Sequence, residues 1–332
     1  MAVLLNDERS SRPVVVVRLC NWIGDVVLSL PALELLEAHG YALHLYGKAW
    51  MPSLLSGYEW PMTVRAASLR DRVSQLKGIR QQYFGSGSPL IQGRRSPQAL
   101  AMPNSFSSAL ELRLAGLTVS GYARDGRSLL LAQRQKPGPE PHALESFWRL
   151  AGQFVGDASI GLPPANIRFK LRPGAIELAQ HLAQSHGLGT DYVCIAPFAS
   201  GTVHKQSKKW PGFSELVSKM VSSGVKVVVC PGPGEEQDAA ALYGGAICLS
   251  DVPLDVYAVL LSQASLVVAN DTGPAHIAAA VGAPLISVLG PTQVALWRPW
   301  GETVKVISRH PVWPSVQEIW EQVVAHLEGQ AA

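Results

Sequence analysis

The second half of the chain alternates between short apolar runs and longer stretches with helical spacing. The short runs are continuous and rich in β-branched residues, which is typical of parallel strands buried on both faces. We predict strands at Tyr192–Ala196, Val225–Cys230, Leu266–Ala269 and Leu285–Leu289, with helices at Gly212–Ser222, Leu254–Gln263 and Pro274–Val281 between them. This alternation is typical of a doubly wound parallel sheet.

The first half of the chain repeats this pattern with shorter elements. One helix should run from about Asp25 to Ala38 and end at Gly40, and we expect Pro31 to kink or restart it. A second helix should end at Ala115, with Asn104 or Ser105 as its cap. The other expected elements are strands at Val14–Val17, Tyr41–Tyr46 and Ala99–Met102 and a helix at roughly His142–Val155.

Composition supports two domains of α/β class. The chain has 332 residues, of which 47% are apolar and 16% charged, so it can bury two cores of ordinary size. The stretch Gly161–Pro173 separates the two patterns. We therefore expect two Rossmann-like domains, residues 1–165 and 166–332, that face each other across a cleft.

Positive charge is concentrated in one part of the chain. The whole chain has a net charge of 28 − 25 = +3, but the segment from Pro61 to Lys136 has twelve Lys or Arg against three acids, a balance of +9. This segment is either an ordinary solvated surface or a basic face that attracts a polyanionic partner or an anionic membrane surface. Nothing in the pattern points to nucleic acid.

The cysteines and the N-terminus indicate a cytoplasmic protein. Four cysteines (Cys20, Cys194, Cys230 and Cys248) lack metal-ligand spacing, so we interpret them as reduced core residues. The first thirteen residues have no apolar segment long enough for a signal peptide, and we interpret them as an exposed leader. No apolar run reaches the length that a membrane span needs.

The strongest candidate site is the turn Asn270-Asp271-Thr272-Gly273-Pro274, which joins a buried strand to an Ala-rich helix. Its threonine or aspartate would cap the helix, and its glycine allows a ligand to approach the backbone closely. Free amides and the helix dipole favour an anion there. His276 in the first turn of this helix and Gly290–Thr292 after the next strand are expected at the same end of the sheet, so we predict a diphosphate site there. The alternative is a well-capped helix without a ligand.

A second candidate is Asn21-Trp22-Ile23-Gly24-Asp25, after the first strand. It matches neither the dinucleotide fingerprint nor a P-loop. Asp25 stands at a helix start behind flexible Gly24, so it either complements the helix dipole or acts as a general base in the cleft. The spacing alone leaves both roles open.

Two further loops carry charged residues after strands. The loop Gly201–Pro211 contains Lys208 and Lys209, which could neutralise phosphate charge. The loop Pro231–Glu236 places Glu235 where a ribose diol could be held. There is no D-x-D, no H-E-x-x-H and no local Ser/His/Asp motif, so we expect neither a bound metal nor a cofactor.

Together these segments resemble glycosyltransferase family 9, the ADP-heptose heptosyltransferases of lipopolysaccharide inner-core synthesis. The resemblance runs from Val14 to about Trp300, and its proline-asparagine-serine segment is closer to the heptosyltransferase II type. It is carried by Val17-Arg18, Ile23-Gly24-Asp25-Val26-Val27, Pro31-Ala32-Leu33, Met102-Pro103-Asn104-Ser105-Phe106 with Ala109, Lys208-Lys209-Trp210-Pro211, Asn270-Asp271-Thr272-Gly273-Pro274, His276 and Gly290-Pro291-Thr292.

The resemblance implies a GT-B fold and an inverting, metal-independent transfer of heptose from ADP-heptose to a lipopolysaccharide inner-core acceptor. Asp25 matches the family's base, and Lys208 matches the lysine that stabilises the departing diphosphate. The loop 200–206 departs from the pattern because it lacks paired threonines. The expected donor contacts are Thr202, His204, Glu235, Val252, Leu254, Asp271, Thr272, Gly273, Pro274 and His276.

The resemblance also implies that the N-terminal domain binds the acceptor and that the acceptor is an anionic, lipid-linked sugar, which the basic segment from Pro61 to Lys136 would attract. We place Trp22 and Gly24 on the acceptor side, where Trp22 replaces a small polar residue and would narrow the site. Contacts with the acceptor or the membrane surface are expected among Arg65, Arg94, Arg95 and Arg124. The protein would then work in the cytoplasm or at the inner face of the inner membrane.

Two alternatives stay open. A nucleotide-sugar 2-epimerase of the same architecture would need no second substrate, and a non-catalytic nucleotide-sugar-binding protein would have no active base. A dehydrogenase is disfavoured because the glycine fingerprint is absent.

Overall fold

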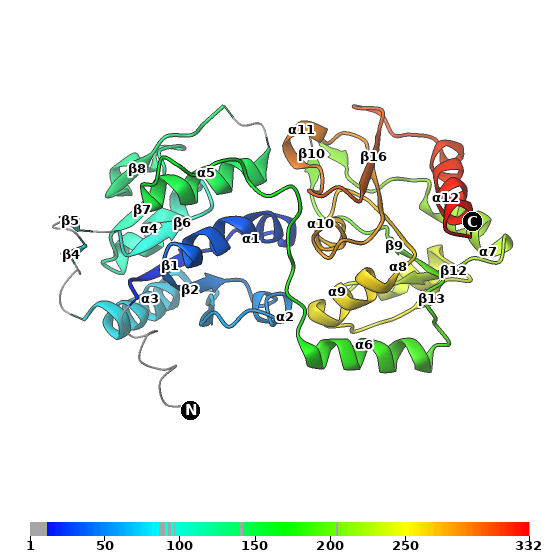
Figure 1. The fold of residues 1–332 in the computed structure, drawn as a ribbon, viewed down its shortest axis with the longest axis horizontal. Helices are drawn as coiled ribbons and strands as arrows, with labels where there is room; N and C mark the ends of the chain where they lie inside the picture. The colour runs from blue at the N-terminus through cyan, green and yellow to red at the C-terminus, as the bar shows by residue number, and fades with distance from the viewer. Residues whose placement is uncertain are drawn as a thin grey trace. The chain divides into compact units, whose positions relative to one another are not determined.

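The computed structural model describes residues 12–85, 90–91, 94–95, 97–139, 142–203 and 205–331. The chain divides into two compact units, coloured mostly blue to green and green to red in Figure 1. Unit 1 comprises Met1–Pro52 and Glu59–Pro163, and unit 2 comprises Ser53–Tyr58 and Pro164–Ala332. The chain passes between the units for the last time at Pro163, within the stretch Gly161–Pro173 that separates the two sequence patterns.

A short early segment, Ser53–Tyr58, belongs to unit 2 because it docks on residues of that unit. The hydroxyl of Ser56 donates to the Asp255 carboxylate at 3.0 Å, and the hydroxyl of Tyr58 donates to the Arg168 carbonyl at 3.3 Å. Arg172 donates to the same carboxylate at 2.8 Å, so Asp255 is buried among several donors. The spacing of residues along the sequence does not indicate that this segment from the first half of the chain belongs to unit 2.

Unit 1 is built on a parallel sheet of six strands in the order β3-β2-β1-β6-β7-β8. Its elements are β1 (Val14–Arg18), α1 (Ile23–Ala38), β2 (Ala42–Gly47), α2 (Met51–Leu54), β3 (Met62–Val64), α3 (Leu69–Phe84), β4 (Leu90–Ile91), β5 (Arg94–Arg95), β6 (Ala99–Ala101), α4 (Phe106–Leu114), β7 (Val119–Tyr122), the 3-10 helix η2 (Arg127–Leu130), β8 (Gln133–Gln135) and α5 (Ala143–Val155).

Helices cover both faces of this sheet, which is why its central strands are almost wholly apolar. Helices α3 and α4 pack on the face that includes Val16 and Ala99. Helices α1 and α5 pack against each other on the other face, as Figure 1 shows. Burying a continuous run such as Val15–Val17 on both sides removes about 1.5–3 kcal/mol of unfavourable hydration per side chain.

Unit 2 repeats the plan with a parallel sheet in the order β13-β12-β9-β14-β15-β16. Helices α7 and α12 pack on the face of Val193 and Ile195. Its elements are α6 (Pro173–Ser185), β9 (Tyr192–Ala196), β10 (Thr202–Val203), β11 (Gln206–Ser207), α7 (Phe213–Ser222), β12 (Lys226–Val229), α8 (Glu236–Leu242), β13 (Ile247–Cys248), α9 (Leu254–Gln263), β14 (Leu266–Ala269), α10 (Gly273–Ala280), β15 (Leu285–Leu289), α11 (Val294–Trp297), β16 (Val304–Ser308) and α12 (Val316–Ala331).

The two parallel sheets confirm the predicted doubly wound α/β class, and two details differ from the sequence expectations. Helix α1 begins at Ile23, before the expected start near Asp25, and it runs as one helix with Pro31 inside it. Ser105 occupies the N-cap of α4, but its side chain makes no capping hydrogen bond. The hydroxyl of Ser108 donates back to the Ser105 carbonyl at 2.7 Å, so this turn is closed from inside the helix.

The cysteines are free thiols, and only two of them are fully buried core residues. Cys20 and Cys194 are buried, Cys230 is half-buried, and Cys248 is exposed at the end of β13. Edge strand β13 has one neighbour in the sheet, so its side chains have less cover than those of β9. In the described part of the chain, no helix combines the length and the apolar character that crossing a membrane requires. The N-terminal residues 1–11, interpreted above as a leader, lie outside the described ranges.

Candidate active site

In unit 2 the predicted site residues follow three neighbouring strands, β9, β14 and β15. The loop with Lys208 follows β9, the turn with Asp271 follows β14, and Thr292 follows β15. Because these strands are parallel and adjacent, their carboxyl ends meet at one edge of the sheet. Residues more than sixty positions apart in the sequence are thereby brought into contact.

The Asp271 carboxylate organises this edge. The Lys208 Nζ lies 2.5 Å from Asp271 Oδ2, and the Thr292 hydroxyl donates to the same oxygen at 2.7 Å. His276 Nε2 lies 4.0 Å from Asp271 Oδ1. The Asp271 side chain is only 6% exposed and that of Lys208 is 22% exposed, so a buried carboxylate holds the ammonium of a partly exposed lysine. This ion pair fixes the direction of the Lys208 charge.

Asn270 fixes the backbone that carries Lys208. Its Oδ1 accepts from the Trp210 amide at 3.0 Å, and its Nδ2 donates to the Pro197 carbonyl at 2.5 Å. The Trp210 indole in turn donates to the Pro314 carbonyl at 3.0 Å. A fully buried asparagine therefore joins the segments after β9 and β14, a role that the sequence motif did not reveal.

The start of α10 has the backbone donors expected of an anion site. Thr272 is its N-cap, in extended conformation, but the side chain accepts no capping hydrogen bond, contrary to the sequence expectation. Asp271, the other expected cap, uses its carboxylate on Lys208 and Thr292 instead. The first-turn amides are therefore not occupied by either side chain, and Pro274 lacks an N–H at this position.

The other residues predicted to contact the donor are exposed, half-buried or outside the described residues. Thr202 is exposed in the β10–β11 hairpin, and His204 lies outside the described residues. Glu235 accepts the Gly232 amide at 2.9 Å through Oε2, so one carboxylate oxygen closes its own loop. Val252 and Leu254 are half-buried at the start of α9.

In unit 1, Asp25 lies in the first turn of α1 and is half-buried. The helix begins two residues earlier than predicted, so Asp25 stands inside the helix rather than ahead of it. Gly24 is buried, and Trp22, at the N-cap, is 62% exposed. A first-turn carboxylate is favoured by the helix dipole, which is compatible with both roles considered from the sequence.

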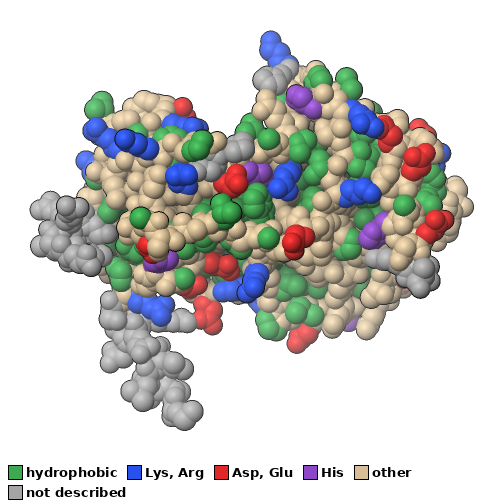
Figure 2. Space-filling view, turned by 45° about the horizontal axis from the view of Figure 1, so that its top comes forward, with side chains coloured by type: hydrophobic (Ala, Val, Ile, Leu, Met, Phe, Trp, Pro, Cys, Tyr) green, Lys and Arg blue, Asp and Glu red, His purple; other side chains and the backbone are tan. Residues whose placement is uncertain are grey.

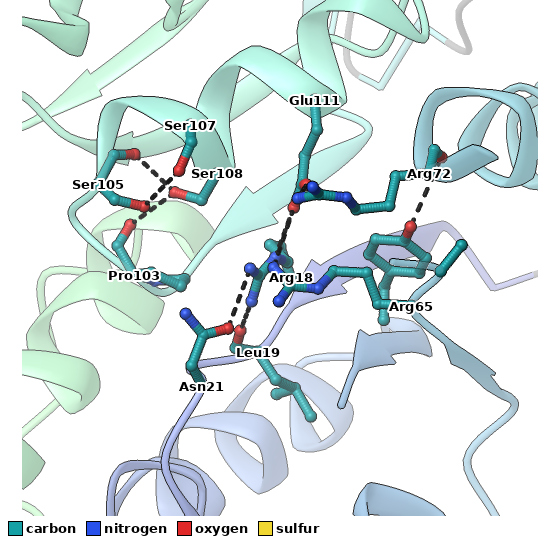
Figure 3. Close-up of polar contacts among 12 residues, drawn as sticks. Arg18, Leu19, Asn21, Arg65, Arg72, Pro103, Ser105, Ser107, Ser108 and Glu111 are labelled. Carbon is teal, nitrogen blue, oxygen red and sulfur yellow. Dashed lines mark hydrogen bonds and ion pairs between the residues drawn. The ribbon is translucent and has the colours of Figure 1, made fainter. Parts of the chain in front are cut away.

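Beneath this loop lies a cluster of arginines around one carboxylate, drawn in Figure 3. Glu111, fully buried on α4, accepts from Arg18 Nε at 2.7 Å and from Arg72 Nη1 at 2.9 Å. Arg65 Nη1 lies 4.0 Å from the same carboxylate. Burial and the neighbouring Arg18 charge lower the pKa of Arg65. Three cations around one carboxylate leave this cluster with a net positive charge.

A fourth arginine, Arg127, is fully buried nearby. It donates to the Tyr122 carbonyl at 2.8 Å, to the Pro103 carbonyl and to Asn104 Oδ1 at 3.4 Å. Burial lowers the pKa of Arg127 to about 10. The proline-asparagine-serine segment is thus fixed by a buried guanidinium, which sequence reasoning counted only as part of a basic stretch.

The predicted acceptor arginines differ in their surroundings. Arg65 is largely buried in the cluster, and Arg124 is exposed after β7. Arg94 and Arg95 form strand β5, but their side chains lie outside what the structure describes. In Figure 2, Lys and Arg side chains gather on the upper part of unit 1 with few acidic ones among them.

Two sequence signals could have revealed the buried cluster. Arg18 ends an otherwise apolar strand, and Glu111 lies in the apolar stretch of α4 beside Leu112. Charged residues at such positions are almost never fully buried unless they are paired. The pairing itself could not be inferred, since Arg18 and Glu111 are separated by 93 residues.

The comparisons with known proteins agree in family and fold. The model of the family "Glycosyltransferase family 9 (heptosyltransferase)" matches residues 92–319, more than half of the chain. Lipopolysaccharide heptosyltransferase 2 of Escherichia coli strain K12 is 23% identical over 306 residues, covering 86% of this chain and 85% of that protein.

Solved structures of related enzymes have the same fold. The structure of E. coli ADP-heptose lps heptosyltransferase II has a TM-score of 0.75 at 21% identity, covering 96% of this chain and 99% of that one. E. coli heptosyltransferase WaaC with ADP-2-deoxy-2-fluoro heptose has a TM-score of 0.67 at 21% identity, covering 96% of this chain and all of that one. With the family model matched and the two Rossmann-like sheets of the GT-B fold in place, this chain belongs to glycosyltransferase family 9, the heptosyltransferase family.

Proposed function

We propose that this glycosyltransferase moves a heptose from ADP-heptose to an anionic, lipid-linked inner-core acceptor, with inversion and without a metal. The observation that carries the donor half is the Lys208–Asp271–Thr292 cluster at the start of α10. A related enzyme, E. coli WaaC, has been solved with ADP-2-deoxy-2-fluoro heptose, which supports an ADP-linked heptose as the donor class.

The leaving group is an ADP diphosphate, and its negative charge grows as the bond to the anomeric carbon breaks. Lys208 and the Thr272 and Gly273 amides at the start of α10 are suited to stabilise that charge, a contribution that is often the largest in catalysis. Asp271 holds the ammonium in place and also neutralises part of its charge. Because this leaves less positive charge on Lys208 for the diphosphate, we assign the backbone amides of Thr272 and Gly273 a share in binding the diphosphate equal to that of Lys208.

The acceptor hydroxyl must lose its proton as its oxygen attacks the anomeric carbon from the side opposite to the diphosphate. We assign Asp25 as the base that takes this proton, an assistance that contributes about 10²–10⁴-fold to rate. Of the remaining donor contacts, Glu235 is assigned to the ribose and Val252 and Leu254 to the adenine. Thr202 and His204 are assigned to the phosphates, and His276 to the diphosphate turn, where its Nε2 lies 4.0 Å from Asp271.

On the acceptor side, the excess of arginine in unit 1 supports an anionic substrate. Arg65 lies beside Arg18 and Arg72, and the three share the single carboxylate of Glu111. A phosphate or carboxylate of the acceptor would complete the charge balance. Trp22 and Gly24 are assigned to the acceptor sugar, and Arg94, Arg95 and Arg124 to the acceptor or an anionic membrane surface at the inner face of the inner membrane.

The central test is Asp25→Ala in a transfer assay with ADP-heptose and a lipid-linked acceptor. We expect kcat to fall at least 10²-fold while ADP affinity is unchanged. A rate near wild type would refute Asp25 as the base. EDTA should leave the wild-type rate unaltered, and loss of activity that Mg²⁺ restores would refute the metal-independent mechanism.

Substrate analysis separates the alternatives. A transferase consumes the donor only slowly without acceptor, whereas an epimerase converts it without one, and a binding protein does not turn it over. Thermal shifts with ADP, UDP and GDP should be largest for ADP. Replacing Arg65 and Arg124 together with Gln should raise the acceptor KM and leave the ADP shift unchanged, and an unaltered acceptor KM would refute the acceptor assignment.

A further inference from the structure

The side chain of Arg18 holds the base of the loop between β1 and α1. Arg18 is 2% exposed, and its guanidinium points toward the loop in Figure 3. One terminal nitrogen donates to the Leu19 carbonyl, and the other donates to Asn21 Oδ1 at 3.2 Å. Asn21 itself is exposed, so this bond ties a surface position of the loop to the interior.

The direction of the Arg18 side chain is set by elements outside the loop. Its Nε donates to Glu111 Oε1 at 2.7 Å, and Glu111 is held from the other side by Arg72 of α3 at 2.9 Å. Arg72 also donates to the carbonyls of Ser68 and Ala67, both at 3.2 Å, which fixes its own position. Helices α3 and α4 thus define where the Arg18 guanidinium lies.

We propose that Arg18 is a positioning residue that holds the Asn21–Asp25 segment, and with it the Asp25 carboxylate, in the orientation needed for proton removal. The proposal rests on the proposed function of Asp25 as the base. Asn21 lies four residues before Asp25, and the Val26 amide donates to the Trp22 carbonyl at 3.1 Å, so the held segment continues directly into the first helical turn.

The chemistry of the guanidinium explains why this position needs arginine. Its planar fork donates in fixed directions to Glu111, Leu19 and Asn21 together, whereas a lysine ammonium is a single point charge on a flexible stem. A base must lie within hydrogen-bonding reach of the proton it removes. A misplacement of about 1 Å can cost about 10²-fold in rate.

The test compares Asn21→Ala and Arg18→Lys with the control Tyr122→Phe, which destabilises another part of unit 1. The Tyr122 hydroxyl, on β7, donates to the Ser146 carbonyl of α5 at 2.6 Å and belongs neither to the loop after β1 nor to the arginine cluster. We expect kcat to fall about 10-fold in Asn21→Ala and about 10²-fold in Arg18→Lys, with both KM values within twofold of wild type. Tyr122→Phe should lower Tm and leave kcat within twofold of wild type.

Asn21→Ala keeps the proposal testable even if Arg18 variants fold poorly, because Asn21 is exposed and its removal leaves the Glu111 ion pairs intact. The proposal is overturned if Asn21→Ala has wild-type kcat, or if kcat across the variants simply follows Tm with Tyr122→Phe included. A rise in KM without loss of kcat would also overturn it, since that result indicates substrate binding.

The proposed base and the positioning role fail in distinguishable ways. Asp25→Ala alone tests the base. With Asp25 intact, Asn21→Ala tests the positioning role. In the Asp25→Ala background Asn21→Ala should cause no further loss of the residual rate, and an undiminished 10-fold loss there would show that the loop acts through another group.

Discussion

Glu111→Gln is the substitution that most directly tests the physical account of unit 1. Glu111 is fully buried and provides the carboxylate for Arg18 at 2.7 Å and for Arg72 at 2.9 Å, with Arg65 at 4.0 Å. Glutamine has nearly the same shape but no charge. The substitution therefore leaves three closely spaced guanidinium groups without the carboxylate they share.

The expected cost follows from the burial of these groups. Removing one partner of a buried ion pair destabilises a protein by about 3–5 kcal/mol, because the remaining charge stays poorly solvated. Arg18 is 3% exposed at its side chain, but Arg72 is 21% exposed and glutamine still accepts a hydrogen bond, so we take the lower end, about 3 kcal/mol. For a unit of this size, about 3 kcal/mol lowers Tm by roughly 6–12 °C.

Differential scanning calorimetry of the full chain measures this loss. The matched control is Asp191→Asn, which breaks an exposed ion pair with Lys226, where the side chains are 68% and 43% exposed. That pair should contribute less than about 1 kcal/mol because water and salt screen it. If Glu111→Gln lowers Tm no more than Asp191→Asn does, the argument that burial makes this carboxylate indispensable is refuted.

Three further predictions concern other parts of the chain. Burial lowers the pKa of His44 from its ordinary 6.5 to about 4, so the unfolded chain binds a proton at this residue before the folded chain does as the pH falls. The free energy of unfolding should therefore have its full value above pH 6.5 and decrease by up to about 3 kcal/mol toward pH 4. Urea midpoints measured for His44→Gln over this pH range should lack this part of the decrease. Lys208→Met should lower kcat about 10²–10³-fold in transfer assays, and a near wild-type kcat would contradict its role toward the diphosphate. Gly290→Ala should cost about 1–3 kcal/mol in chemical unfolding, because a Cβ there would lie 2.4 Å from the Trp313 ring, whereas Gly161→Ala, with no atom within 4 Å, should change little.

The elements of unit 2 followed closely from the sequence. Strands Tyr192–Ala196, Leu266–Ala269 and Leu285–Leu289 have the bounds that the apolar runs predicted. Such strands are buried on both faces, so their whole length is marked by composition. The capping of α10 was less predictable. Thr272 occupies the N-cap position but its side chain makes no capping hydrogen bond, and the carboxylate of Asp271, the other expected cap, pairs with Lys208.

By itself, the sequence determined the doubly wound class, the segments at the carboxyl ends of strands and the family resemblance, because these depend on short-range patterns and on motifs. Only the tertiary structure decided which charges meet: Lys208 with Asp271 and Arg18 with Glu111. It also assigned Ser53–Tyr58 to unit 2. The physical reason is that strand order and helix packing, rather than spacing along the chain, set the distance between residues far apart in sequence. A buried charge is stable only beside a partner that the fold brings to it.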